Sequence, residues 1–493
     1  MKFTLKTILI IVTFLLLQVS CADKDMNKGG NTDGDPDSPV TTQNYISYLY
    51  NYSSENTNNT VEISIITDGT IQTIKDLDLT IPPLKYNKSW LFMLTQDDCV
   101  QAAFCRTWAA INGRPVSNSD SIWLTPNWKI LYYDVEQLAA DDLPPNSYYL
   151  GKTLGSSDGC GNEIRFHATT TLSPESDFMN ATTSVNKGFT NNYYRFFMKS
   201  GLRWSNVKEM LNFGTGIAFH DMNTTSTQNT DSILKHYQIA QDSILKNLPG
   251  RGAKMLAEPN GNKAYVAAAN SFPDIQTLAA QSGGVELYPF QTTTDLQKVL
   301  LSRYFPNDTA TIVADIQALT QLPKTERKAI HVGVHNTDNK WVNFLLWLNN
   351  TYGKDGDDSV WFPSQEEYYE YNYYRIHSTM NTTVNGDTLR IQLTMPSGEY
   401  FYYPSLTLNL SGIQTENIRA VSTNDAVTGF SFGNHNGGLT LNIDCRNHLV
   451  EHATHYVEAY EKNPTSLSLA DARYFVNQLK ESTTKEALLK RLE

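Results

Sequence analysis

The chain has 493 residues and a net charge of −12, which allows two or three domains with a sizeable core. The acidic balance argues against a nucleic-acid partner, because no basic stripe is present to neutralise phosphates. The 27 Tyr and 8 Trp are many for so polar a chain. Aromatic faces are common platforms for sugar rings, although most such residues pack in cores and loops.

The first residues have the pattern of an export signal. Lys2 and Lys6 precede the apolar stretch Ile8–Val19, which is too short to span a bilayer comfortably and fits the apolar region of a signal peptide. We therefore expect a signal peptide over residues 1–20.

Residues 17–21, Leu-Gln-Val-Ser-Cys, resemble the lipobox of bacterial lipoproteins, with Gln18 where an aliphatic residue is usual. The resemblance implies a lipid on Cys21 that anchors an exported protein in the cell envelope, most simply at the outer membrane. The alternative is an ordinary signal peptide followed by an unmodified cysteine. Residues 21–42 are rich in Asp, Gly, Asn and Pro, and this composition predicts a flexible tether.

The other four cysteines allow two disulfides in three pairings, among which the sequence does not choose. They are Cys99, Cys105, Cys160 and Cys445.

Strand and helix patterns alternate along the middle of the chain, which indicates an α/β architecture. We expect a distorted (β/α) barrel over residues 43–375, with an irregular insertion at about 106–205. The expected strands are Val61–Thr67, Ser89–Leu94, Gly214–Phe219, Ala253–Ala257, Lys328–Val334 and Ser359–Pro363. The expected helices are Asp231–Leu248, Asp295–Tyr304, Thr311–Leu319, Trp341–Tyr352 and Gln365–Arg375.

After residue 376 the apolar pattern changes to a period of two, which predicts a β-sandwich-like accessory domain over 376–447. Its expected strands are Thr388–Thr394, Tyr400–Tyr403 and Leu406–Leu410. Residues 448–493 have helical spacing and predict a helical tail.

Polar residues follow three of the expected barrel strands: Asp97 and Asp98, then His220, then His335. Because the carboxyl ends of parallel strands meet at one rim, these side chains are candidates for one site. A carboxylate and an imidazole can bind a divalent metal, while a second carboxylate remains free as a base. The alternative is that each residue only caps a turn or makes a local hydrogen bond.

Residues 95–99, Thr-Gln-Asp-Asp-Cys, resemble the Thr-Phe-Asp-Asp-Gly motif of the polysaccharide deacetylases, the NodB-homology carbohydrate esterases. His220 is similar to the first histidine of the family's His-x-x-x-His motif, and His335 to that of its late Leu-x-His motif. Pro259 and Gly261 resemble its Arg-x-Pro-Tyr-Gly segment. Asp357–Trp361 and Glu366–Tyr371 also look like its final strand and helix.

The resemblance implies a role for each matching residue. Asp97 would be the general base and His335 the general acid, while Asp98 and His220 would be ligands of a divalent metal, most simply zinc. A backbone N–H near Asp98–Cys99 would hold the oxyanion.

The sequence departs from the family pattern at four positions. The second metal-binding histidine falls on Thr224, so a third ligand is missing; Thr224, Asp221, Asn223 and His236 are candidates without the expected spacing. The family arginine that orients the base falls on Ala257, its tyrosine falls on Asn260, and Cys99 replaces the glycine after the aspartates.

The function implied is metal-dependent removal of acetyl groups from a polysaccharide or oligosaccharide by a membrane-anchored protein. The alternative is a glycan-binding lipoprotein without activity, which keeps the fold but has a degenerate metal site. A second motif, His448-Leu-Val-Glu451-His452 with His455, matches the inverted zincin pattern. We interpret it as one face of a helix in the tail.

Overall fold

The computed structural model describes residues 59–74, 77–117, 130–131, 147–180, 197–198, 201–221, 227–396 and 398–493. The chain divides into two units, Met1–Tyr45 and Ile46–Glu493, and all described residues belong to the second. The signal peptide, Cys21 and the tether therefore lie outside the described residues.

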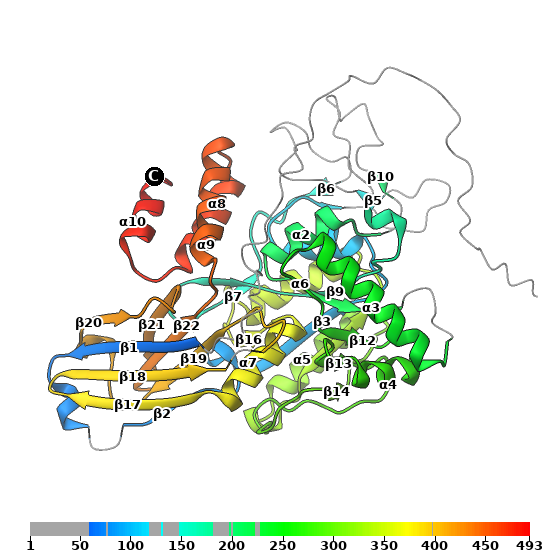
Figure 1. Cartoon of the computed structure of the whole chain (residues 1–493). Coiled ribbons are helices and arrows are strands. Elements are labelled where there is room, and N and C mark those ends of the chain that lie inside the picture. Colours follow the sequence, from blue (N-terminus) through cyan, green and yellow to red (C-terminus); the bar gives the residue numbers. More distant parts are fainter. Residues whose placement is uncertain are drawn as a thin grey trace, which may run out of the picture. The chain divides into compact units, whose positions relative to one another are not determined.

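An eight-stranded parallel sheet is the main element of the described part (Figure 1). Its order is β14-β13-β12-β11-β9-β3-β15, and β16 pairs with β3. A parallel bridge between Tyr304 and Val332 links the chain after β14 to β15, so the sheet curls back on itself. The predicted α/β class is confirmed, and this sheet is compatible with the expected (β/α) barrel. The strands are β3 (Trp90–Gln96), β9 (Thr169–Thr171), β11 (Gly216–Phe219), β12 (Met255–Ala257), β13 (Thr277–Ala279), β14 (Leu300–Leu301), β15 (Ile330–Val334) and β16 (Val360–Trp361).

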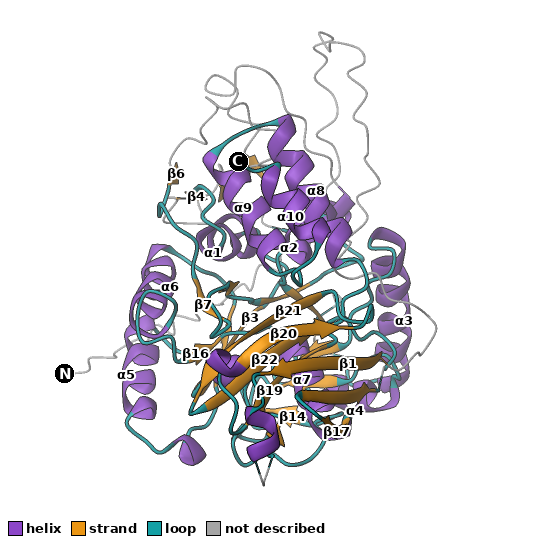
Figure 2. Ribbon diagram, turned by 90° about the vertical axis from the view of Figure 1, so that its left-hand side faces the viewer, coloured by secondary structure: helices purple, strands orange, loops and turns teal. Residues whose placement is uncertain are grey.

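Helices pack on the outer face of this sheet (Figure 2). They are α2 (Trp204–Asn212), α3 (Thr230–Asn247), α4 (Lys263–Ser271), α5 (Thr309–Thr320) and α6 (Asn339–Tyr352). Four of them begin at an Asn or Asp whose side chain accepts a backbone N–H of the first turn: Asn229, Asn262, Asp308 and Asp338. The apolar stripe of α3, with Ile233 and Tyr237, is buried in the same core as Phe92 of β3.

Helix α7 (Gln365–His377) closes the amino end of the barrel sheet. The Gln365 side chain donates to the Thr277 hydroxyl at the start of β13 (2.8 Å). At the start of β11, a Cβ on Gly216 would lie 2.7 Å from the Cβ of Ser364, so only glycine permits this close approach. The carboxyl end of the sheet is thereby left as the end where a site can form.

Three buried carboxylates hold α7 in place, and each has a cationic partner. Burial of unpaired charges is costly, so the partners are required for the helix to pack here. The pairs are Glu366 with Arg251, Glu367 with Lys85 and His167, and Glu370 with Lys254.

Two antiparallel sheets form the accessory sandwich, as the period-two pattern predicts. One has the order β17-β18-β1-β20 and the other β2-β19-β22-β21, and their inner faces share one core. Because β1 pairs with β18 and β20, residues that precede the barrel in sequence complete this sandwich. The strands are β1 (Asn59–Thr67), β2 (Leu79–Thr80), β17 (Thr379–Asn385), β18 (Thr388–Met395), β19 (Ser405–Leu410), β20 (Ile418–Thr423), β21 (Gly429–His435) and β22 (Gly438–Asp444).

Four expectations from the sequence need correction. The strand Val61–Thr67, expected in the barrel over residues 43–375, is β1 of the sandwich, because it pairs with β18 and β20. The helix expected over Asp295–Tyr304 is wrong, because this segment is a loop that leads into the short strand β14. The strand expected over Tyr400–Tyr403 is also wrong: the backbone N–H groups of Tyr402 and Tyr403 donate to Glu370 instead of to a neighbouring strand. The range 106–205, expected to be an insertion, contains β9, which pairs with β3 and β11 inside the barrel sheet.

The tail is helical as predicted, with α8 (Leu449–Lys462), α9 (Ser466–Asn477) and α10 (Thr483–Lys490). Asp471 of α9 accepts from both Arg114 and Arg165, so an ionic triad that is almost fully buried ties the tail to the barrel.

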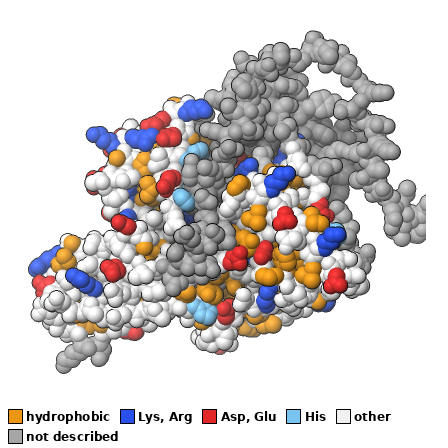
Figure 3. Space-filling model, viewed as in Figure 1, with side chains coloured by type: hydrophobic (Ala, Val, Ile, Leu, Met, Phe, Trp, Pro, Cys, Tyr) orange, Lys and Arg blue, Asp and Glu red, His pale blue; other side chains and the backbone are white. Residues whose placement is uncertain are grey.

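No described helix combines the length and apolar character needed to cross a membrane. The other short elements include the π-helix η4 (Ala103–Trp108), α1 (Ala109–Ile111), β4 (Val116–Ser117), β5 (Ile130–Leu131), β6 (Ser147–Tyr148), β7 (Gly155–Ser157), β8 (Glu163–Arg165) and β10 (Phe197–Met198). On the face shown in Figure 3, acidic and basic side chains are interspersed.

Candidate functional site

The carboxyl ends of the barrel strands bring the candidate residues to one rim. Asp97 and Asp98 directly follow β3, His220 follows β11, and His335 follows β15. The backbone N–H of Asp97 donates to the carbonyl of Val334 (2.8 Å), which sets the first aspartate beside the end of β15. The imidazole Nε2 of His220 lies 3.4 Å from Oδ1 of Asp98. Residues more than 200 positions apart in sequence therefore share one site.

Asp97 is fully buried and forms a two-point ion pair with Arg303. Oδ1 and Oδ2 each accept from one terminal nitrogen of the guanidinium at 2.8 Å, and neither side chain is exposed. Arg303 is itself fixed, because its Nε donates to the carbonyl of Ala280 (2.8 Å). This geometry orients the carboxylate and gives the buried group a two-point partner.

Arg303 was not among the residues expected from the sequence. The family resemblance assigns the orienting arginine to the position of Ala257, at the end of β12. The structure supplies the guanidinium from two residues after β14 instead. The sequence does contain a sign of this site, because Arg303 follows the apolar pair Leu300-Leu301. We did not interpret this pair as a strand, because a helix was expected over Asp295–Tyr304.

Asp98 and His220 form the second pair of the site. The Asp98 side chain is 54% exposed, and its pKa is lowered by the contact with His220, with burial acting in the opposite direction. The Nδ1 of His220 is 2.9 Å from the carbonyl of Ala257, which selects the tautomer with the proton on Nδ1 and turns Nε2 toward Asp98. Burial lowers the pKa of His220, but the charge of Asp97 and the contact with Asp98 outweigh it, so the pKa is raised.

These two side chains have the donor chemistry of a zinc site, an imidazole nitrogen and a carboxylate oxygen. Within the described ranges, no three His, Cys, Asp or Glu residues are grouped to hold a metal ion. Thr224 and Asn223 lie outside the described residues. Asp221 is described and only partly buried. His236 is on α3 with its Nδ1 3.0 Å from Glu175, so it has another partner.

His335 is exposed at the rim, and a phenylalanine positions it. The rings of Phe305 and His335 lie 5.3 Å apart and are tilted by 31°, while the Arg303 guanidinium lies 4.9 Å from the same phenyl ring. The ring fits there because Gly333 has no side chain: a Cβ would come within 2.4 Å of Phe305. Phe305 thus contacts both the expected acid and the arginine that orients the expected base.

The backbone at Asp98 and Cys99 is in the left-handed region, with φ of 66° and 51°. This conformation favours glycine, which explains why a glycine would suit the position of Cys99. The N–H of Cys99 lies 3.3 Å from the Thr171 hydroxyl, to which it donates, so this N–H has a side-chain partner within the protein. Thr171, the last residue of β9, was not expected at the site because its strand lies inside the range read as an insertion.

The remaining candidate motifs have structural roles. His452 of α8 is fully buried and packs edge-on against Phe475, with ring centroids 4.2 Å apart. Burial lowers its pKa, so it behaves as a neutral core aromatic. The four cysteines of the described part are free: Cys99, Cys105 and Cys445 are buried and Cys160 is partly buried.

No curated protein matches the chain. The model of a family described as "Putative polysaccharide deacetylase" matches residues 61–493. The match covers the sandwich, the barrel with its rim of acids and histidines, and the helical tail, and the chain therefore belongs to this polysaccharide deacetylase family.

Proposed function

We propose that this protein hydrolyses acetyl groups on a glycan with the aid of a divalent metal, most simply zinc. The proposal is carried by one observation: the two adjacent aspartates have different partners and different exposure. Asp97 is buried and held by Arg303, whereas Asp98 is half exposed beside His220. A buried, oriented carboxylate suits a base, and an accessible carboxylate next to an imidazole suits metal ligation.

Asp98 and His220 would hold the metal, which when bound supplies a Lewis acid for the acetyl carbonyl and a nucleophile at neutral pH. Asp97, oriented by Arg303, would take the proton of the attacking water. His335, which packs against Phe305, would give a proton to the departing alkoxide or amine. The oxygen of the attacking water becomes part of acetate, and one of its protons goes to Asp97. The proton given by His335 completes the released hydroxyl or amine.

The decisive experiment measures metal content and acetate release together. Purified protein, Asp98→Asn and His220→Gln are analysed for bound metal and incubated with acetylated xylo- and chito-oligosaccharides. We expect bound zinc and acetate release in the parent, and loss of both in the variants. Asp274→Asn, outside the rim, serves as a control for a lost carboxylate. A parent protein that binds no divalent metal and releases no acetate would refute the proposal and favour a glycan-binding protein without activity.

We also propose that Cys21 is lipidated and anchors the protein in the cell envelope. The support is the lipobox-like sequence 17–21. Mass spectrometry of the mature amino-terminal peptide tests this: a diacylglyceryl-modified Cys21 is expected, and an unmodified one would refute it.

A further inference from the structure

A closed ring of hydrogen bonds lies directly behind the rim and joins two of its segments. Its members are the side chains of Gln96, the last residue of β3, Thr107 of the π-helix η4, and Thr337 in the loop between β15 and α6. We call these three side chains the rim network. Each residue is at most 2% exposed. Gln96 immediately precedes the expected base, and Thr337 lies two residues after the expected acid, so the rim network connects the segments that carry them.

Each member of the rim network is both a donor and an acceptor. The Thr107 hydroxyl donates to Oε1 of Gln96 (2.9 Å), an amide oxygen that can only accept. Since Thr107 has no second proton, the Thr337 hydroxyl donates to Thr107 (3.1 Å). The same Thr337 hydroxyl lies 3.4 Å from the carbonyl of Ala102. Nε2 of Gln96 donates to Thr337 (3.4 Å) and closes the ring, and hydrogen bonds connected in this way strengthen one another.

Thr337 anchors the loop that carries His335. It is the only buried residue between positions 335 and 338, whereas His335 is exposed. Arg106, the neighbour of Thr107 in η4, donates from Nη1 to the carbonyl of Thr337. Two consecutive residues of the π-helix therefore hold the hydroxyl and the carbonyl of one loop residue. π-Helical turns are rare and often occur at functional sites.

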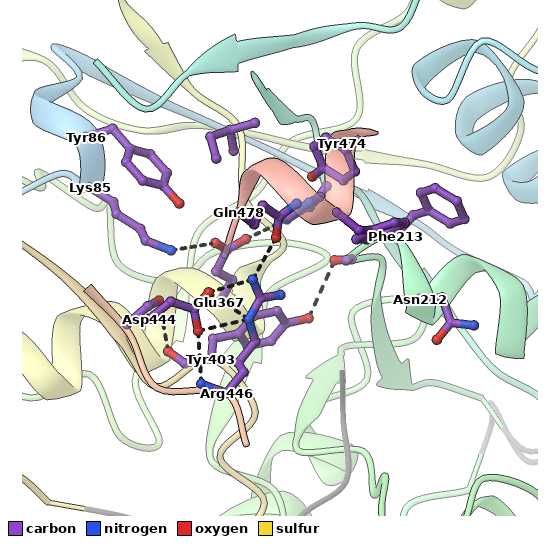
Figure 4. Close-up of a pocket in the computed structure, with 15 residues that line it drawn as sticks. Lys85, Tyr86, Asn212, Phe213, Glu367, Tyr403, Asp444, Arg446, Tyr474 and Gln478 are labelled. Carbon is purple, nitrogen blue, oxygen red and sulfur yellow. Dashed lines mark hydrogen bonds and ion pairs between the residues drawn. The ribbon is translucent and has the colours of Figure 1, made fainter. Parts of the chain in front are cut away.

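Arg106 differs from the charged side chains at the amino end of the barrel. There, Glu367 lies 3.5 Å from Lys85, and Arg446 forms an ion pair with Asp444 (Figure 4). Arg106 is 2% exposed, and it forms no ion pair with any residue that the structure describes. Burial of a cation without a carboxylate is unfavourable. Stability alone therefore does not account for this arginine, whereas a role in holding the rim loop does.

We propose that the rim network positions the expected acid. Thr107 holds Thr337, and Thr337 keeps the loop with His335 at a fixed distance from the base. Both threonines are positioning residues, because they are buried behind the rim. A sugar leaving group needs a proton from a donor within hydrogen-bond reach, and a displacement of about 1 Å can cost roughly a hundredfold in rate. The inference rests on the proposed function, because it takes His335 as the acid.

The test is Thr107→Val, which keeps the branched shape of the side chain but removes its hydroxyl from the rim network. Two substrates are compared: the acetylated oligosaccharide that the parent protein hydrolyses, and 4-nitrophenyl acetate, whose leaving group departs without a proton. We expect kcat for the oligosaccharide to fall about tenfold to a hundredfold, with kcat for 4-nitrophenyl acetate little changed. Thr107→Ser restores the hydroxyl and should restore kcat, and His335→Gln should show the same difference between the substrates.

A second measurement does not depend on activity. Hydrogen–deuterium exchange of peptides that cover residues 332–342 reports local opening of the rim loop. We expect exchange in Thr107→Val to be about tenfold faster than in the parent, because two buried groups lose a partner. Thr337→Val should have the same effect, and the double variant little more, because both residues belong to one network. Thr407→Val is the matched control, since this threonine is fully buried in the sandwich and donates to Asn442 (2.8 Å).

The possible results are distinguishable. Faster exchange together with a loss of kcat confined to the oligosaccharide, both absent in Thr407→Val, supports the proposal. Unchanged exchange over residues 332–342 overturns it, as does an equal loss of kcat for both substrates. Faster exchange in Thr107→Val, with no acetate released by the parent protein, would support the anchoring of the loop and refute the proposed function alone.

Discussion

Replacing Arg303 by methionine would leave the Asp97 carboxylate buried without its partner. Both side chains are 0% exposed, and two nitrogen–oxygen distances of 2.8 Å join them. Removal of one partner from such a buried pair costs about 3–5 kcal/mol, because the remaining charge is neither solvated nor paired. We therefore expect Arg303→Met to lower the free energy of unfolding by about that amount.

The measurement is urea unfolding of the full chain followed by tryptophan fluorescence. Asp97→Asn and the double variant complete a cycle, and the double variant should lose less than the sum of the single losses. The control is Arg491→Met, whose partner Glu461 is 44% exposed and whose loss should cost under about 1 kcal/mol. Additive losses, or an Arg303→Met cost as small as the control's, would refute the reasoning.

Three further variants test other parts of the structure. Phe305→Leu should lower kcat for acetate release about tenfold with KM little changed, which is less than the roughly 10²–10⁴-fold loss expected for His335→Gln. Phe305→Tyr should restore kcat. An unchanged kcat in Phe305→Leu would exclude a positioning role for Phe305. Glu367→Gln should destabilise by about 3 kcal/mol at pH 7, because His167 and Lys85 outweigh burial and lower the pKa of Glu367 from 4.5 to about 2. The contribution of the Glu367 carboxylate to the free energy of unfolding is fully present above pH 4.5 and is lost as the pH falls toward 2. Between these pH values, the free energy of unfolding of Glu367→Gln should therefore fall less than that of the parent protein. Gly216→Ala should cost about 1–3 kcal/mol by thermal unfolding, because its Cβ would press on α7; an unchanged melting temperature would contradict the packing described.

The sequence was most informative where an apolar run ended in a polar residue. Asp97, Asp98, His220 and His335 all follow strands that their residues predict, and parallel pairing brings them to one rim. The long amphipathic helices were also predictable, since apolar spacing and capping residues agree, as in α3 (Thr230–Asn247).

The sequence was less informative where tertiary contacts decide the local structure. β14 has two residues and β9 is three threonines, so neither has an apolar run long enough to predict a buried strand. Arg303 was missed for this reason, because its role depends on a strand that only the sheet defines. Tyr402 has an aromatic, strand-like neighbourhood, but the buried Glu370 carboxylate captures its N–H.

The pairing of β1 has a consequence for how the molecule is made. Ile65 of β1 pairs with Leu389 of β18 and with Val421 of β20, so its hydrogen-bonding partners are synthesised more than 300 residues later. Contacts of such long sequence separation are slow to form and expose strand edges until they do. Formation of the sandwich must therefore wait until most of the chain is available, and a truncation before residue 388 would leave β1 without either neighbour. We expect such fragments to aggregate, whereas the complete chain protects β1 on both edges.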